Sequence, residues 1–99
     1  MKEFTYTIVD KDGMHARPAG RLVACAKQFA SSISVGANGK TADAKRLISL
    51  MMLGAVCGTT LYFSVAGEDE ERAALELEHF CHTQWNPTGT VVNDETVEN

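Results

Sequence analysis

The sequence predicts an α+β domain in which a four-stranded antiparallel sheet is covered on one face by three helices. Short runs alternate apolar and polar residues, as half-buried strands do, and other segments repeat apolar residues every three to four positions, as amphipathic helices do. These segments follow in the order strand, helix, strand, strand, helix, strand, helix. An antiparallel sheet with its helices on one face is the most economical packing for that order.

The first strand is expected over residues 4–9, where large apolar side chains alternate with threonines. The segment 10–13, Asp-Lys-Asp-Gly, ends it, and Gly13 is expected to adopt a backbone conformation closed to other residues. A helix tolerates proline in its first turn, so Pro18 places the start of the first helix at about Ala16. That helix should run to Ser31-Ser32 and bury a stripe of Ala19, Leu22, Val23, Ala26 and Phe29.

The middle of the chain predicts a hairpin and a short helix. Strands over residues 33–37 and 40–43 are joined by Asn38-Gly39, the strongest short-range hairpin signal. A helix is then expected over residues 45–53, with Gly54 as its stop.

The last strand is expected over residues 59–66, and the acids of 68–71 suit the start of a final helix because its N-terminus favours negative charge. This helix should fade near Trp85, since Asn86-Pro87 and Gly89 disrupt helices. Its inner stripe is expected to comprise Ala73, Ala74, Leu77, Phe80, Cys81 and Gln84.

The 99 residues suffice for one domain with a modest core. We expect that domain over residues 1–85, because residues 86–99 lack apolar periodicity and carry only acidic charges, which predicts a disordered tail. No apolar run approaches the ~20 residues of a membrane span, and the N-terminus alternates like a strand instead of resembling a signal peptide. The expectation is a cytoplasmic protein without membrane insertion.

The cysteines, at 25, 57 and 81, have no paired spacing, so we expect them to be reduced and at least partly buried. His79, Cys81 and His82 lie close in sequence, yet residues 81 and 82 of a helix project in different directions and no fourth ligand is evident. No metal site is therefore expected.

The net charge of −4 hides an asymmetry. Residues 13–54 carry six basic side chains and one acid, whereas residues 55–99 carry one base and nine acids. A basic half suits phosphate or an acidic protein partner. The acidic other half and the lack of interleaved aromatic residues argue against nucleic acid.

The segment 13–19, Gly-Met-His-Ala-Arg-Pro-Ala, carries the candidate chemistry. It places His15 at a helix entrance, where the unpaired N–H groups and the helix dipole make Ala16, Arg17 and Pro18 a site for an anion. Arg17 adds a forked donor suited to phosphate oxygens, and a neutral histidine is a nucleophile near physiological pH. A lone histidine before a helix is often only a cap, so the neighbouring residues decide in favour of phosphoryl transfer.

This segment, followed by Gly20, Leu22, Val23, Ala26 and Phe29, resembles the active-site helix of HPr, the histidine-containing phosphocarrier family of the bacterial sugar phosphotransferase system. The resemblance continues through Asn38-Gly39-Lys40, residues 45–54 and residues 66–70, and covers about residues 1–85. It implies an open-faced β-sandwich with the element order βαββαβα.

The resemblance implies that His15, assisted by Arg17, accepts a phosphoryl group from phosphorylated enzyme I on its delta nitrogen and passes it to IIA domains of sugar permeases. The sequence itself does not choose between the two ring nitrogens. No cofactor is implied, and the covalent phosphohistidine belongs to a carrier rather than to a stand-alone enzyme. Two alternatives are a regulatory paralogue of a nitrogen-linked or glycerone-kinase phosphorelay, and a non-catalytic protein-binding module in which His15 is structural.

Residues 45–53 hold more apolar side chains than a short helix can bury, so part of them should face water or a partner, with burial in the core as the alternative for each. Lys45 rims this cluster, and Gly20, which disfavours a helix interior by about 1 kcal/mol relative to alanine, suggests close packing at its position. With the resemblance, the expected docking residues are Gly20, Arg46, Leu47, Ile48 and Met51.

Many family members carry a serine just before the second helix, which a dedicated kinase modifies in low-GC Gram-positive bacteria. The matching residue here is Arg46, and Ser49 lies three positions on. The chain departs from the family at that regulatory position.

Overall fold

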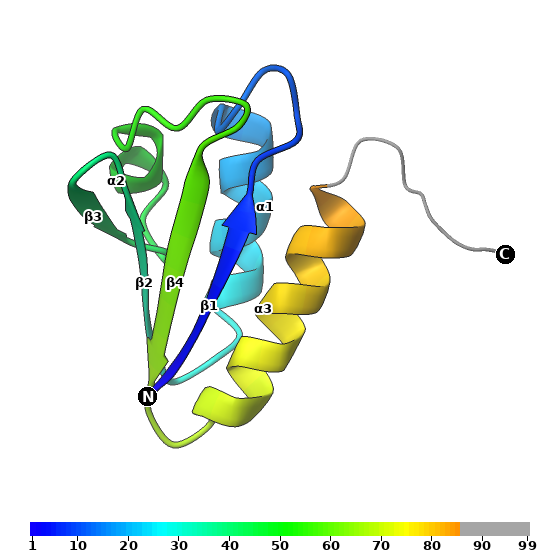
Figure 1. Cartoon of the computed structure of the whole chain (residues 1–99). Helices are drawn as coiled ribbons and strands as arrows, with labels where there is room; N and C mark the ends of the chain where they lie inside the picture. Colours follow the sequence, from blue (N-terminus) through cyan, green and yellow to red (C-terminus); the bar gives the residue numbers. More distant parts are fainter. Residues whose placement is uncertain (86–99) are drawn as a thin grey trace, which may run out of the picture.

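The computed structural model describes residues 1–85, in which a sheet is backed by helices (Figure 1). The strand order across the sheet is β1-β4-β2-β3, and each neighbouring pair is antiparallel. The α+β class and the βαββαβα order are as predicted. The elements are β1 (Lys2–Thr7), α1 (Ala16–Ala26), β2 (Ser32–Ala37), β3 (Lys40–Asp43), α2 (Leu47–Met51), β4 (Thr60–Ala66) and α3 (Glu70–Gln84).

The core lies between one face of the sheet and the helices. Along β4, an inner strand, Leu61 and Phe63 are buried, whereas Tyr62 between them points to the opposite, open face and is 55% exposed. Leu22 of α1 and Leu77 of α3 enter the same buried cluster. This arrangement is the open-faced sandwich that the sequence predicted.

Helix α1 ends at Ala26, earlier than predicted, although its apolar stripe continues to Phe29. The chain tightens after the helix, because the N–H of Gln28 bonds the carbonyl of Cys25 and that of Phe29 bonds Ala26, three residues back. Phe29 is nonetheless buried. Periodicity therefore identified its burial but not its secondary structure.

Helix α2 spans five residues, fewer than the predicted 45–53. Asp43 accounts for the later start: its carboxylate accepts the N–H of Lys45 at 2.9 Å and its carbonyl accepts that of Arg46 at 3.0 Å, so both residues belong to a turn. The Lys45 ammonium donates to the carbonyl of Phe29 at 2.7 Å. Lys45 thus holds the chain just after α1. The sequence predicted it at the rim of a docking cluster and did not indicate this contact.

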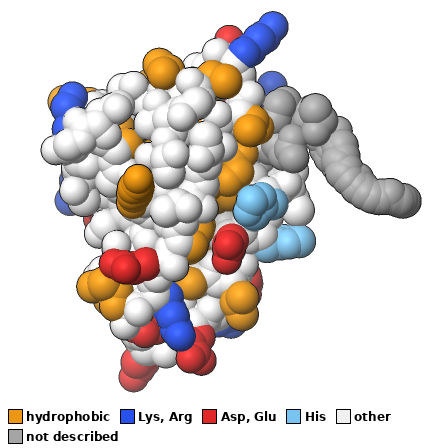
Figure 2. Space-filling view, viewed as in Figure 1, with side chains coloured by type: hydrophobic (Ala, Val, Ile, Leu, Met, Phe, Trp, Pro, Cys, Tyr) orange, Lys and Arg blue, Asp and Glu red, His pale blue; other side chains and the backbone are white. Residues whose placement is uncertain are grey.

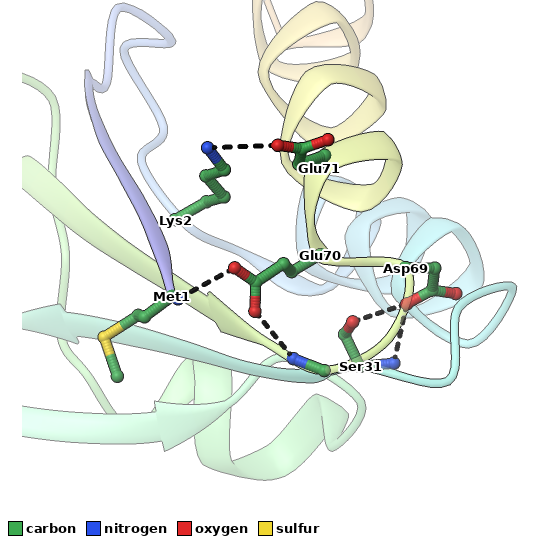
Figure 3. Close-up of polar contacts among 7 residues, drawn as sticks. Met1, Lys2, Ser31, Asp69, Glu70 and Glu71 are labelled. Atoms are coloured by element: carbon green, nitrogen blue, oxygen red, sulfur yellow. Dashed lines mark hydrogen bonds and ion pairs between the residues drawn. The ribbon is translucent and has the colours of Figure 1, made fainter.

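Helix α3 begins beside the end of α1, and a carboxylate joins the two regions (Figure 3). Asp69, at the N-cap of α3, does not cap its own helix; it accepts the N–H groups of Ala30 and Ser31 at 2.9 and 3.0 Å and the hydroxyl of Ser31. These hydrogen bonds hold the pKa of Asp69 below the usual value of an aspartate. Figure 2 shows acidic side chains gathered at this end of the molecule, where β1 and α3 begin.

The inner face of α3 buries Ala73, Leu77 and Cys81, while Gln84, predicted to face inward, is exposed. Trp85 takes the inward place instead and is 7% exposed. The helix ends where the sequence predicted. The expected tail over residues 86–99 lies outside the described residues.

The three cysteines differ in exposure. Cys81 is buried and Cys25 half-buried, as expected, but Cys57 is exposed in the loop before β4, so the expectation was wrong for that residue. Within residues 1–85, no helix combines the length and the apolar character needed to cross a membrane.

Candidate functional site

The loop before α1 is fixed against the loop before β4. Gly13 has φ +68°, and a Cβ there would lie 2.6 Å from the carbonyl oxygen of Ala55, so only glycine fits. The N–H of Met14 donates to the same oxygen at 2.9 Å, and the Met14 side chain is buried. This anchoring confirms the expected role of Gly13 and sets the position of the next residue, His15.

His15 is the N-cap of α1, in an extended backbone conformation, and its side chain makes no capping hydrogen bond. The carbonyl of His15 accepts the N–H of Ala19 at 3.1 Å, which begins the helical ladder. The imidazole is 41% exposed. The backbone of His15 takes part in the hydrogen bonds of the helix, whereas its side chain does not. A purely structural function of His15 would therefore not account for its half-exposed ring.

The first turn of α1 offers unpaired donors. The N–H groups of Ala16 and Arg17 have no acceptor within residues 1–85, Pro18 has no N–H, and the first turn carries no acidic side chain. Ala16 and Arg17 are exposed and Pro18 is half-buried. Two free donors and the positive end of the helix dipole therefore meet beside the imidazole, an arrangement suited to a phosphate dianion.

A cavity of about 470 Å³ opens beside His15. Arg17 and Arg21 supply positive charge to its lining, while Tyr6 and Trp85 supply aromatic surface. The Tyr6 hydroxyl is buried without a hydrogen-bond partner in the described chain, and burial raises the pKa of Tyr6 to about 12. Tyr6 is thus a neutral phenol in the lining of this cavity and contributes no charge to it.

Sequence reasoning missed two acids beside the histidine. Oδ2 of Asp10 lies 3.9 Å from Nε2 of His15, and ligand atoms of Asp10, Asp12 and His15 all lie within 4.8 Å of one another. The sequence pattern of residues 10–13 predicts only a turn. The one sign that acids lie near the imidazole is the presence of two aspartates five and three positions before His15. Two carboxylates and an imidazole are donors that a divalent transition metal accepts, so these are the residues that could contact such an ion.

The predicted docking residues on α2 are accessible. Ile48 is 67% exposed, Leu47 and Met51 are 37% and 38% exposed, and Arg46 is exposed at the N-cap. Leu50 and Leu53 are buried, so the segment divides between core and surface as expected. Helix α2 contacts α1, which places this surface beside the helix of His15. Met52 and Val56, which the sequence did not single out, are exposed as well.

Gly20 lies half-buried on α1, and a Cβ there would meet no atom of residues 1–85 within 4 Å. The expectation of close packing at Gly20 is wrong for the described chain, because the space above it is open.

A half-exposed histidine lies at the N-terminus of a helix of this open-faced sandwich, beside amide donors that are free within residues 1–85, an arrangement suited to an anion such as a phosphoryl group. Comparison with known proteins agrees: residues 2–83 match the family described as "PTS HPr component phosphorylation site". The chain belongs to the HPr family, the phosphocarriers of the bacterial phosphotransferase system.

Relatives and solved structures show how far the similarity extends. The phosphocarrier protein HPr of Haemophilus influenzae is 44% identical over 70 residues, which cover 71% of this chain and 82% of that protein. That of Lysinibacillus sphaericus is 42% identical over 73 residues, 74% of this chain and 83% of that protein. The crystal structure of HPr-C-His from Thermoanaerobacter tengcongensis superposes with a TM-score of 0.80 at 38% identity, covering 86% of this chain and 96% of that one.

Proposed function

We propose that this chain accepts a phosphoryl group on His15 from phosphorylated enzyme I and passes it to IIA domains of sugar permeases. The observation that carries the proposal is the imidazole of His15, which is 41% exposed and makes no capping bond, beside two amide donors that have no partner within residues 1–85. The proposal locates the protein in the cytoplasm. Its catalytic residues are His15 and Arg17.

In the transfer step a ring nitrogen of His15 attacks the phosphorus, a new N–P bond forms, and the N–P bond of the donor phosphohistidine breaks. The amides of Ala16 and Arg17 and the Arg17 guanidinium stabilise the charge on the transferring oxygens. Because the site is open to solvent, these interactions hold the phosphoryl group only moderately, as a carrier requires if it is to release the group again.

One surface of the carrier must meet its donor and its acceptors in turn. Leu47, Ile48 and Met51 supply exposed apolar area, and Arg46 supplies exposed positive charge. The space above Gly20, where no atom of the described residues lies within 4 Å of the position that a Cβ would take, would admit a partner side chain. We infer that this surface, with Gly20, docks both partners.

The two alternative functions require different roles of His15. A regulatory paralogue of a nitrogen-linked or glycerone-kinase phosphorelay uses the same chemistry with other partners. A non-catalytic binding module needs a structural histidine, and the absence of a side-chain capping bond at His15 favours the phosphocarrier over that module.

The test is incubation with enzyme I and ³²P-labelled phosphoenolpyruvate, comparing the native chain with His15→Ala. His79→Ala and His82→Ala are matched controls, because both histidines are exposed on α3. Label should appear in the native chain and in both controls, be lost in acid and survive in base. Label in His15→Ala, or acid-stable label in the native chain, contradicts the proposal. Label passing to a IIA domain of a sugar permease separates the sugar branch from the other phosphorelays.

A further inference from the structure

We propose that Asp10 is a positioning residue that keeps the imidazole proton of His15 on Nε2 and leaves the Nδ1 lone pair free to attack phosphorus. This inference rests on the proposed function, in which His15 is the phosphoryl acceptor. It identifies a residue of this chain that sets which ring nitrogen reacts.

The carboxylate of Asp10 is held in place by the turn that precedes the helix. Its Oδ1 accepts the N–H of Asp12 at 2.9 Å, and its carbonyl accepts the N–H of Gly13 at 3.0 Å. With one oxygen engaged in this way, Oδ2 is the atom that faces His15, 3.9 Å from Nε2. Both side chains are part-buried, 34% exposed for Asp10 and 41% for His15, so water screens the pair incompletely.

A carboxylate can only accept hydrogen bonds, whereas neutral imidazole bears its single proton on one of two nitrogens. The tautomer with the proton on Nε2 points an N–H dipole at Asp10, and the opposite tautomer points a lone pair at it. The first is therefore favoured. At 3.9 Å the contact is longer than a direct hydrogen bond, so the proposal requires the half-exposed ring to rotate until Nε2 comes within hydrogen-bond distance of Oδ2.

The same carboxylate assists the chemical step. As Nδ1 forms its bond to phosphorus and the donor N–P bond breaks, positive charge develops on the imidazole ring while the proton stays on Nε2. Asp10 stabilises that charge without becoming protonated, as the carboxylate of a catalytic triad does for its histidine. The contact that Asp10 makes beside the site is with the imidazole, so we assign it a role that acts through His15.

The experiment compares Asp10→Asn with Asp12→Asn, which removes the same charge from the same cluster. In Asp10→Asn the amide oxygen keeps the hydrogen bond from the Asp12 N–H, so the NH₂ group faces Nε2 and favours the proton on Nδ1. Two-bond ¹H–¹⁵N correlation spectra of the unphosphorylated protein, at a pH where His15 is neutral, should show the Nε2–H form in the native chain and in Asp12→Asn. The Asp10→Asn spectrum should shift towards the Nδ1–H form.

Phosphoryl transfer from enzyme I provides the second readout. We expect Asp10→Asn to slow it at least tenfold and at least fivefold more than Asp12→Asn does, with equal melting temperatures for all three chains. Asp10→Ser, which can keep the turn through its hydroxyl but lacks the second oxygen, should be slowed to an intermediate extent. An unchanged tautomer in Asp10→Asn, or equal shifts in both asparagine variants, overturns the inference. The spectra need no partner protein, so this failure is distinguishable from failure of His15 to be labelled.

Discussion

The indole N–H of Trp85 donates to the carbonyl oxygen of Pro18, 3.0 Å away, and so ties the last described residue to the helix that carries His15. Trp85→Phe removes this hydrogen bond and keeps most of the apolar area. We expect a loss of about 1 kcal/mol in the free energy of unfolding, measured by urea denaturation. Leu75→Ala, at a position 71% exposed on α3, is the control and should change stability by less than about 0.5 kcal/mol.

Two glycines near His15 should respond oppositely to replacement by alanine. Gly20→Ala places a methyl group in open space on a helix and should stabilise the fold by about 0.5–1 kcal/mol. Gly13→Ala forces a Cβ against the carbonyl of Ala55 at positive φ and should destabilise it by about 2 kcal/mol or more. Thermal melts of both variants check the pair, and a neutral Gly13→Ala would contradict the packing described for this loop.

Under the proposed function, Arg17→Glu should slow phosphoryl acceptance about 100-fold, because a negative charge would replace the guanidinium that we propose to stabilise the transferring oxygens. Stability should change by less than about 1 kcal/mol, since the side chain is exposed. Quench-flow transfer from phosphorylated enzyme I gives the rate, and thermal melting gives the stability. Arg21→Glu, one turn further along the same cavity lining, is the matched control and should be the milder variant.

Ile48→Asp should weaken binding to enzyme I and to IIA domains together, by about 2 kcal/mol in each case, with a normal melting temperature. The side chain is 67% exposed, so no unpaired charge is buried. Calorimetric titration with each partner measures the effect. Leu50→Asp, at a fully buried position of the same helix, should instead unfold the protein.

The same titration at rising salt tests the charge of the docking surface. Arg46 and Arg17 should steer an acidic partner mainly through the association rate, so binding should weaken as ionic strength rises. Binding insensitive to salt would contradict an acidic partner.

Acid should loosen the junction at Asp69. Its hydrogen bonds from Ser31 and Ala30 lower the pKa of the carboxyl in the folded state. This stabilisation is therefore complete above the pKa of the unfolded chain, near 4, and is lost as pH falls through the lower folded value. Asp69→Asn should melt lower at pH 7 and lose less stability between about pH 5 and pH 2 than the native chain. Parallel acid-dependent losses in the two chains would contradict this assignment.

Much of the fold was predictable from local pattern. Strand alternation and the Asn38-Gly39 turn gave β2 and β3 within a residue, and the period of α1 gave Ala19, Leu22 and Ala26 as core. Helix ends were less predictable, because a side chain from elsewhere decides them. The carboxylate of Asp43 withdraws Lys45 from α2, a competition that apolar periodicity does not record.

The residues of the candidate site were likewise predictable from the sequence only in part. His15, Ala16, Arg17 and Pro18 are contiguous, so the motif alone placed them on one helix end. Asp10 lies in a loop whose path depends on the contact of Gly13 with Ala55, more than 40 residues away in sequence. The approach of Asp10 to Nε2 of His15 therefore depends on tertiary contacts. The same holds for the burial of Trp85, just after α3, where Gln84 was expected to face the core.

The free amides at the start of α1 also couple chemistry to folding. A dianion on His15 would complete the capping of a helix that otherwise begins without it. Thermodynamic linkage is reciprocal, so whatever the phosphoryl group gains from the helix, the folded state gains from the phosphoryl group. The phosphorylated and unphosphorylated proteins would then differ in conformational stability. A partner would distinguish them by the rigidity of this helix as well as by the charge on His15.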